Sequence, residues 1–421
     1  SEQLLKNNDG TNRNTMNNDV NMSDDNNNNN IKSITEMLEA CEKGNLAFIE
    51  QRINENNMNA RLQDPQTGIS PLMVASKVGN LELTKALLTA GAPWNAIDRN
   101  GLCAGNYATN AEHWEIVNVL VDWGTQAEFI LGQVQRNITI TTAGNTDTAA
   151  VDASGNPLPV QQQPSTKPDY LQQPLRYVNE NNALIDQDND AVMMEWERPI
   201  MEAHATILMD STVFNTIANT TALPPRKRIL NIGFGMGIID NIIQQSEKFQ
   251  GCVAQHSIIE AHPHVYQKII KEEQKFDTKY PNVQVYFGKW QDVCPQLISQ
   301  GILFDAIFFD TYGEHFLDME DFHIQMLPKL LCKPYGIYSF FNGLAPDNIF
   351  FHGVACNCIK LQLQNIGMDT EFLPCQIQAN KNQEWENIRR KYWHDRDTYY
   401  LPRITWNPTA LMTTTTTTSD N

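Results

Sequence analysis

A glycine-rich turn between two apolar segments places the strongest constraint on how this chain can fold. Residues Arg228–Asp240 read Arg-Ile-Leu-Asn-Ile-Gly-Phe-Gly-Met-Gly-Ile-Ile-Asp, so an apolar run ends in Gly233, Gly235 and Gly237 before a second apolar segment. This order predicts a strand, a tight turn and a helix N-terminus, where backbone N–H groups can approach a nucleotide-type ligand. Glycine is needed because a Cβ would obstruct both the turn and the close approach. Since such turns also occur as plain strand-to-helix connections, the interpretation depends on the residues after the turn.

A carboxylate at the end of the next apolar run supports a ligand site. Ser257-Ile-Ile-Glu260 predicts a second buried strand that ends in Glu260, 23 residues after Gly237. In doubly wound folds an acid at this place accepts hydrogen bonds from ribose hydroxyls. An acid in a solvated loop is the alternative, but the end of an apolar run after a glycine-rich turn favours the ribose contact.

Three further apolar runs predict the rest of a sheet: Val283–Phe287, Phe304–Phe309 and Gly336–Phe341. Segments of helix length separate the runs, which is typical of an α/β domain with a parallel sheet. Dinucleotides and S-adenosylmethionine are the two ligand classes that suit this frame. The Gly-x-Gly-x-Gly form, Asp310-Thr-Tyr after the fourth run and Lys333-Pro-x-Gly before the fifth favour S-adenosylmethionine.

Five motifs taken together resemble those of guanidinoacetate N-methyltransferase. They are Val192–Met201 with its Trp-Glu-x-Pro sequence, Gly233–Gly237, Ile258–Glu260, Gly288–Trp290 and Phe309–Tyr312. The whole chain is more similar to the fungal protein arginine N5-methyltransferases, which join ankyrin-like repeats to the same catalytic domain. The resemblance implies an α/β, class I (Rossmann-like) methyltransferase fold with S-adenosylmethionine as cofactor. It also implies methyl transfer to the internal δ (N5) guanidino nitrogen of arginine residues in a protein substrate.

The resemblance also implies roles for individual residues. The residues that would line the cofactor are Met193, Met201, Gly233, Phe234, Gly235, Met236, Gly237, Ile238, Glu260, Ala261, His262, Gly288, Lys289, Trp290, Gln291 and Asp310. Tyr177 would lie in the segment that covers the cofactor, and Glu197 and Asp310 would be the catalytic residues facing the guanidinium. The small-molecule enzyme has proline after Asp-Thr-Tyr, whereas Gly313 follows here, and this alters the rim of the acceptor pocket.

The chemistry of a guanidinium explains why two carboxylates are needed. It is a poor nucleophile because its lone pairs are delocalised over a planar group that stays protonated. Carboxylates on two edges can hold that plane by bidentate hydrogen bonds, and one can take the proton as the new bond forms. Glu197 and Asp310 could instead be a helix-start acid and a strand-end cap. Trp196 and Tyr312 are candidates for flat walls beside the acceptor, or for simple packing.

Other interpretations stay open at this point. Enzymes that methylate terminal arginine nitrogens carry two glutamates after the fourth strand, where Glu314 and Glu320 stand here, but the surrounding motifs fit the other family better. A small-molecule guanidino methyltransferase is disfavoured by the repeats. A catalytically inert binding protein is disfavoured because Glu197, Glu260 and Asp310 are all present.

A 33-residue repeat precedes the catalytic domain. Paired residues recur at this spacing: Thr67-Gly68 with Asn100-Gly101, Leu87-Leu88 with Leu120-Val121, and Ala90-Gly91 with Trp123-Gly124. Ser70-Pro-Leu-Met-Val-Ala75 also resembles the start of an ankyrin repeat. Such all-α repeats either present a surface to a partner or substrate or stabilise the neighbouring domain.

Composition completes the predicted domain plan. We expect a disordered Asn-rich tail at 1–30, ankyrin-like repeats at 31–130, a linker at 131–168, the methyltransferase domain at 169–412 and a disordered tail at 413–421. The N-terminal tail has almost no apolar side chains to bury, and the linker is rich in Thr, Ala, Gln and Pro without periodicity.

Charge and cysteine content limit the kinds of partner and ligand that this chain can have. The net charge of −18 argues against direct nucleic-acid binding and suits a basic protein substrate, such as a ribosomal or other RNA-associated protein. No run has membrane-spanning length and no signal-peptide core is present, so no membrane contact is expected. The cysteine pattern favours a reducing cytoplasmic and nuclear setting, and we expect a monomer. The eight cysteines include no Cys-x-x-Cys pair. Because His262-Pro-His264 and Cys356-Asn-Cys358 lack matching half-sites, no metal is expected.

Overall fold

The computed structural model describes residues 32–142, 169–219, 226–271, 275–314, 316–377, 385–386, 388–389, 393 and 397–409. The tails predicted at 1–30 and 413–421 lie outside these residues, as does the predicted linker from 143 to 168. The chain divides into two compact units. The first, here called the repeat unit, holds Ser1–Ile130 and Asn348–Val354, and the second, the sheet unit, holds Leu131–Asp347 and Ala355–Asn421.

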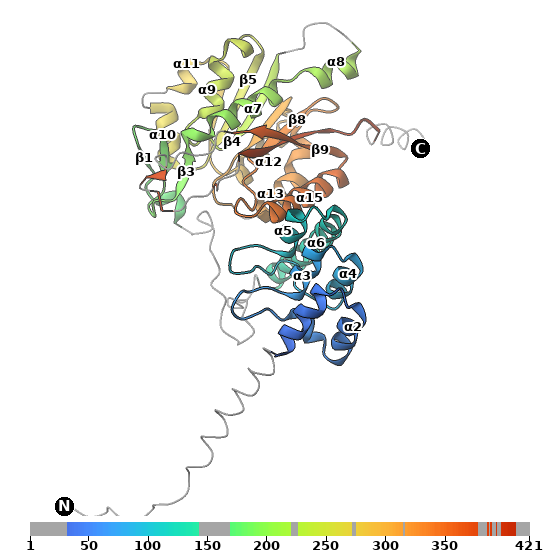
Figure 1. Cartoon of the computed structure of the whole chain (residues 1–421). Helices are drawn as coiled ribbons and strands as arrows, with labels where there is room; N and C mark the ends of the chain where they lie inside the picture. The colour runs from blue at the N-terminus through green and yellow to red at the C-terminus, as the bar shows by residue number, and fades with distance from the viewer. Residues whose placement is uncertain are drawn as a thin grey trace, which may run out of the picture. The chain divides into compact units, whose positions relative to one another are not determined.

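Short helices and one long helix build the repeat unit (Figure 1). They are a helix over 32–42, α2 (Leu46–Glu55), the 3-10 helix η1 (Asn57–Arg61), α3 (Pro71–Val78), α4 (Leu81–Thr89), α5 (Ala104–Asn110) and α6 (Trp114–Thr142). Helix α6 continues to Thr142, well into the segment from 131 that the sequence predicted as linker. No proline interrupts this stretch, so nothing in the backbone chemistry ends the helix earlier.

Local signals explain where these helices begin and turn. The Ser70 side chain accepts a hydrogen bond from the Met73 backbone N–H at 3.3 Å, and Pro71 occupies the first helical position of α3. Gly68 and Gly101 both adopt the left-handed conformation, with φ of 76° and 77°. The recurrence of glycine after 33 residues therefore reflects the same turn in consecutive repeats.

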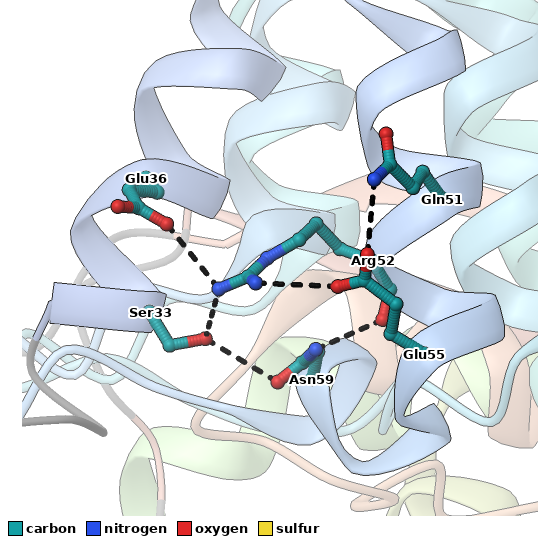
Figure 2. Close-up of polar contacts among 6 residues, drawn as sticks. All are labelled: Ser33, Glu36, Gln51, Arg52, Glu55 and Asn59. Carbon is teal, nitrogen blue, oxygen red and sulfur yellow. Dashed lines mark hydrogen bonds and ion pairs between the residues drawn. The ribbon is translucent and has the colours of Figure 1, made fainter.

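One arginine joins the first three elements of the repeat unit (Figure 2). Arg52 donates from Nη2 to Ser33 Oγ and Glu36 Oε2, both at 3.2 Å, and from Nη1 to Glu55 Oε2 at 3.3 Å. Its backbone carbonyl accepts a hydrogen bond from Asn59 Nδ2 at 2.9 Å. Because these groups are partly exposed, the network contributes little energy but gives the first repeat a polar end.

A seven-stranded mixed sheet forms the centre of the sheet unit (Figure 1). Its order is β6-β5-β4-β7-β8-β10-β9, and the first five of these strands are parallel. Their bounds are β4 Lys227–Ile232, β5 Val253–Glu260, β6 Val283–Phe287, β7 Ala306–Phe309, β8 Ile337–Phe340, β9 Met368–Gln376 and β10 Thr398–Trp406. The five strands predicted from apolar runs are confirmed. Strands β9 and β10, which pair antiparallel to each other, were not predicted.

Alternate residues of the parallel strands enter two different cores. Leu230 and Ile307 pack against α12 (Trp290–Ser299), α14 (Leu327–Leu330) and α15 (Ile349–Asn365). Their neighbours Ile229 and Ala306 pack on the other face. That face is covered by α7 (Arg198–Met209) and α9 (Ile238–Gln245). Burial on both faces is why these strands read as continuous apolar runs in the sequence.

A small antiparallel sheet precedes the large one. It consists of β1 (Arg176–Val178), β2 (Ala183–Ile185) and β3 (Ala191–Met194), and the 3-10 helix η4 (Glu195–Glu197) then leads into α7. The remaining helices are α8 Thr212–Ala218, α10 Pro263–Lys271, α11 Phe276–Lys279, α13 Phe316–Asp321 and a π-helical turn over Phe322–Met326. None of the helices in the described ranges has both the length and the apolar content that crossing a bilayer would require.

Candidate active site

A cavity of about 530 Å³ lies where β4, β5, β6 and β7 end. In a parallel sheet this edge is where ligands bind, because the glycine turn and the strand-end side chains meet there. Eleven of the residues predicted for the cofactor line it: Met193, Gly233, Gly235, Glu260, Ala261, His262, Gly288, Lys289, Trp290, Gln291 and Asp310.

The glycine turn comes so close to the neighbouring strand that no side chain fits. Gly233 has φ of 92°, and a Cβ built on it would lie 1.9 Å from the backbone oxygen of Asp310. A Cβ on Gly235 would lie 2.9 Å from Met193 Sδ. Glycine at 233 therefore keeps the turn against the end of β7, and the cavity lies in front of both.

Glu260 ends β5 as a buried carboxylate that the turn itself holds in place. Its Oε2 accepts the Phe234 N–H at 3.0 Å and its Oε1 accepts the His262 N–H at 2.6 Å. Burial raises the pKa of this carboxyl, and backbone N–H groups, those of His262 and Phe234 foremost, oppose that shift. Each oxygen keeps a second lone pair, so the group can still accept hydrogen bonds from ribose hydroxyls.

Six predicted cofactor residues support the cavity from outside its wall. Tyr177 donates from its hydroxyl to the Gly235 carbonyl oxygen at 3.2 Å, so it fixes the turn. Met201 and Ile238 are buried together in the core under α7 and α9. The other three, Phe234, Met236 and Gly237, belong to the turn and are also absent from the cavity wall. Motif spacing could not separate a turn residue that faces the ligand from one that faces the core.

Asp310 is a buried carboxylate at the end of β7. Its Oδ2 accepts no hydrogen bond from any described residue. Burial, and after it the negative charge of Asp240, raise the pKa of the Asp310 carboxyl to about 7. Asp240 is itself buried on α9 and accepts two hydrogen bonds from Asn231 Nδ2, each 2.9 Å long. A cation placed beside Asp310 would supply the missing donor and the missing positive charge.

Glu197 is buried at the start of α7, with 3% of its surface exposed. Its Oε1 accepts the Met194 N–H at 3.0 Å, so it does cap the helix start, as the alternative interpretation held. Glu197 is not among the residues that line the cavity. Besides burial, the charges of Asp310 and Glu197 raise the pKa of the Tyr399 hydroxyl. Tyr399 Oη accepts the Asn342 N–H at 2.6 Å.

The two predicted aromatic walls have different surroundings. Tyr312 lines the cavity, and its ring centroid lies 5.9 Å from that of Tyr170. Trp196 instead packs against Trp385 and Trp393, with ring centroids 6.1 and 6.0 Å away. For Trp196 the packing interpretation therefore describes the contacts better.

Several lining residues were not predicted. They are Tyr170, Leu171, Gln172, Leu175, Val192, Ile232, Ile259, Val265, Thr311 and Asp318. Residues 170–175 carry no periodic or motif signal, and their place over the cavity depends on a contact far along the chain, the 3.1 Å hydrogen bond between His262 Nε2 and the Gln173 carbonyl oxygen. Within the described ranges, no group of three or more His, Cys, Asp or Glu side chains is arranged to hold a metal ion.

Side chains of the protein surround the Glu314 carboxylate. This is not expected if Glu314 binds a guanidinium, as the glutamates of enzymes that methylate terminal arginine nitrogens do. Trp290 Nε1 donates to Glu314 Oε1 and Oε2 at 3.1 and 3.0 Å, and Gln291 Nε2 donates to Oε1 at 3.1 Å. Thr311 Oγ1 donates to Oε2 at 2.7 Å. Because each of its oxygens already accepts two hydrogen bonds from the protein, Glu314 is not arranged to clamp a guanidinium.

Comparisons with known proteins match both units. The family model described as guanidinoacetate N-methyltransferase matches residues 175–347, and the model described as ankyrin repeats (3 copies) matches residues 37–129. The protein named "Protein arginine N-methyltransferase 2" from Aspergillus oryzae is 30% identical over 420 residues, which cover 88% of this chain and 95% of that protein.

Two further relatives carry the same name. The protein from Candida glabrata is 30% identical over 396 residues, covering 86% of this chain and 90% of the relative. The protein from Yarrowia lipolytica is 36% identical over 244 residues, covering 56% of this chain and 47% of the relative.

Proposed function

Since this chain belongs to the protein arginine N-methyltransferase 2 family, we propose that it transfers a methyl group from S-adenosylmethionine to the δ nitrogen (N5) of arginine residues in a protein. The family confirms the resemblance inferred from the motifs, and the chain is a protein arginine methyltransferase. The observation that carries the acceptor assignment is Asp310, a buried carboxylate at the cavity whose Oδ2 accepts no hydrogen bond from the described residues.

The donor side of the cavity has the groups that this cofactor requires. Glu260 can accept hydrogen bonds from the ribose hydroxyls at the end of β5. The turn at Gly233 lets backbone approach the ligand without a side chain between them. The cavity volume of about 530 Å³ falls in the range of small-molecule sites. When bound, S-adenosylmethionine supplies a methyl group that its sulfonium already activates.

On the acceptor side, Asp310 and Glu197 would hold the guanidinium plane and balance its charge. Hydrogen bonds that the guanidinium donates to carboxylates keep positive charge on the donating nitrogens and leave the target nitrogen richer in electrons. Asp310, with a pKa raised to about 7, is suited to take the proton that the attacking nitrogen loses. Glu197 and the Oδ2 atom of Asp310 are shielded from solvent, and exclusion of water strengthens each of these interactions.

A protein acceptor fits this chain better than a free small molecule. Relatives named as protein arginine methyltransferases match both the repeats and the sheet unit, whereas the guanidinoacetate model matches only 175–347. The net charge of −18 favours a basic protein, and we propose a ribosomal or other RNA-associated substrate in the cytoplasm or nucleus on that ground. The repeats offer a second surface for holding that substrate.

Mass spectrometry can test the reaction directly. The full chain is incubated with cofactor carrying an isotope-labelled methyl group and with proteins from cells that lack this enzyme. We expect labelled arginine in a small set of peptides. A methyl on a terminal nitrogen allows loss of methylamine on fragmentation, whereas a methyl on the δ nitrogen does not. Methylamine loss from every labelled peptide would overturn the δ assignment, and label found only in added guanidinoacetate would overturn the protein acceptor.

A further inference from the structure

Glu314 connects the acceptor side of the cavity to the donor side. It follows β7 and shares that loop with Asp310, yet its carboxylate accepts hydrogen bonds from Trp290 and Gln291, which follow β6. A third donor, Thr311 Oγ1, lies 2.7 Å from Oε2. Three donors around one carboxylate fix its orientation, and the carboxylate in turn fixes theirs.

This arrangement determines which way the Gln291 amide points. A carboxylate offers only acceptors, so the amide must present its NH₂ group to Glu314, and Nε2 donates at 3.1 Å. The amide oxygen is thereby turned away from Glu314. That Oε1 is buried and has no hydrogen-bond partner among the described residues, although Gln291 lines the cavity. A buried acceptor without a donor indicates a missing partner.

The strand order shows which part of the cofactor reaches Gln291. The reacting methyl must face Asp310 at the end of β7, and the ribose must reach Glu260 at the end of β5. Since the order is β6-β5-β4-β7, the purine extends beyond the ribose toward β6 and the residues that follow it. Gln291 is therefore positioned to contact the edge of the base, where adenine carries a 6-amino donor.

We propose that Glu314 is a positioning residue that holds the Gln291 oxygen toward the 6-amino group of adenine, and thereby makes the site select a 6-aminopurine over a 6-oxopurine. The inference rests on the proposed function, because it requires the adenosyl cofactor. A 6-oxo group would place an acceptor against the Gln291 oxygen, and the fixed amide could not turn to offer its NH₂ group.

Calorimetric binding of two ligands tests this inference without turnover. The ligands are S-adenosylhomocysteine and S-inosylhomocysteine, which differ at the 6 position of the purine and in the protonation of N1. The parent should bind the adenosyl ligand on the order of tenfold or more tightly than the inosyl ligand. The inosyl ligand loses the hydrogen bond to Gln291 and places its own 6-oxo acceptor against the Gln291 oxygen. Glu314→Ala frees the amide to turn, so this preference should fall to within about twofold of that in Gln291→Ala.

Matched variants separate positioning from general loosening. Asp292→Ala truncates an exposed carboxylate on the same helix and should keep the parent preference. The double variant Glu314→Ala/Gln291→Ala should match Gln291→Ala alone, because Glu314 acts through that amide. If Glu314→Ala melts before binding can be measured, Glu314→Gln replaces it. One amide oxygen then serves three donors, so the preference should lie between those of the parent and Gln291→Ala.

The outcomes distinguish this inference from the proposed function. A full parent-like preference in the Glu314 variants, or in Gln291→Ala, would overturn the role of Glu314, as would a parent that binds both ligands equally. The proposed function would stand in each of these cases, because the adenosyl ligand still binds. A folded parent that binds neither ligand would overturn the proposed function itself.

Discussion

Replacing Asp310 by asparagine should change how the stability of the protein depends on pH. The Asp310 pKa is 3.8 in an unfolded chain and about 7 in the folded protein without ligand. The folded state therefore holds this proton more tightly. Its contribution to stability is complete below the unfolded pKa and is lost as pH rises through the folded pKa. Between pH 5 and pH 8 the loss is roughly 3 kcal/mol.

Asp310→Asn removes this pH-dependent contribution to the free energy of unfolding, because the amide does not titrate. From pH 5 to pH 8 the temperature at which the sheet unit unfolds should fall further in the parent than in the variant. The extra fall is roughly 6–12 °C, at about 2–4 °C per kcal/mol for a domain of this size. Scanning calorimetry at several pH values measures this difference, and Asp292→Asn, which changes an exposed acid, should behave like the parent.

The same carboxylate gives a kinetic signature. If the deprotonated form accepts the proton of the acceptor, kcat/KM of the parent should rise with pH through about 7. Asp310→Asn should lose about 10²–10⁴-fold in single-turnover methyl transfer. If the melting temperatures of the parent and Asp310→Asn fall equally between pH 5 and pH 8, the claim that burial raises the Asp310 pKa is refuted. A variant rate within a few-fold of the parent would refute the catalytic role.

Three other changes test the rest of the site. Glu260→Ala should weaken S-adenosylmethionine binding by about 1.5–3 kcal/mol in calorimetry, the value of hydrogen bonds to a charged group, and unchanged affinity would contradict the ribose contact. Gly233→Ala should abolish cofactor binding or lower the melting temperature, since its Cβ would lie 1.9 Å from the Asp310 oxygen; parent-like binding and melting would show that the turn can relax. Glu197→Gln keeps an oxygen for the Met194 N–H, so it should fold and bind cofactor yet lose about 10²–10⁴-fold in turnover. Turnover near the parent rate would leave Glu197 as a helix cap only.

Local chemistry made the parallel strands and the turn predictable. Strands β4, β7 and β8 are almost entirely buried on both faces, so their sequences are nearly continuous apolar runs. Strand β6 lies at the edge of the sheet and is only partly buried, but its β-branched and aromatic residues still indicate a strand. Gly233 and Gly68 are needed for backbone conformations that other residues adopt at a cost, so glycine marks these turns directly in the sequence. Strand β10 escaped prediction because it contains Pro402, which argues against a strand inside a sheet.

The division between ligand-facing and core-facing residues was decided by tertiary packing. Met201 and Glu260 both came from motifs, but the path of α7 buries the first in the core whereas the strand end exposes the second to the cavity. Trp196 likewise packs against Trp385 and Trp393, aromatic rings that stand far away in the sequence. Spacing along a chain carries no information about which side of an element meets a cavity.

The sequence by itself determined the domain type, the glycine turn and the acids at the strand ends, because strands, turns and repeats depend on residues close along the chain. Only the tertiary structure decided the properties that arise between distant residues. The raised pKa of Asp310, at the end of β7, depends on burial and on the charge of Asp240, which belongs to helix α9. The orientation of Gln291 depends on Glu314, which stands on the loop after a different strand. Both effects are electrostatic and act through space, so the order of residues along the chain cannot reveal them.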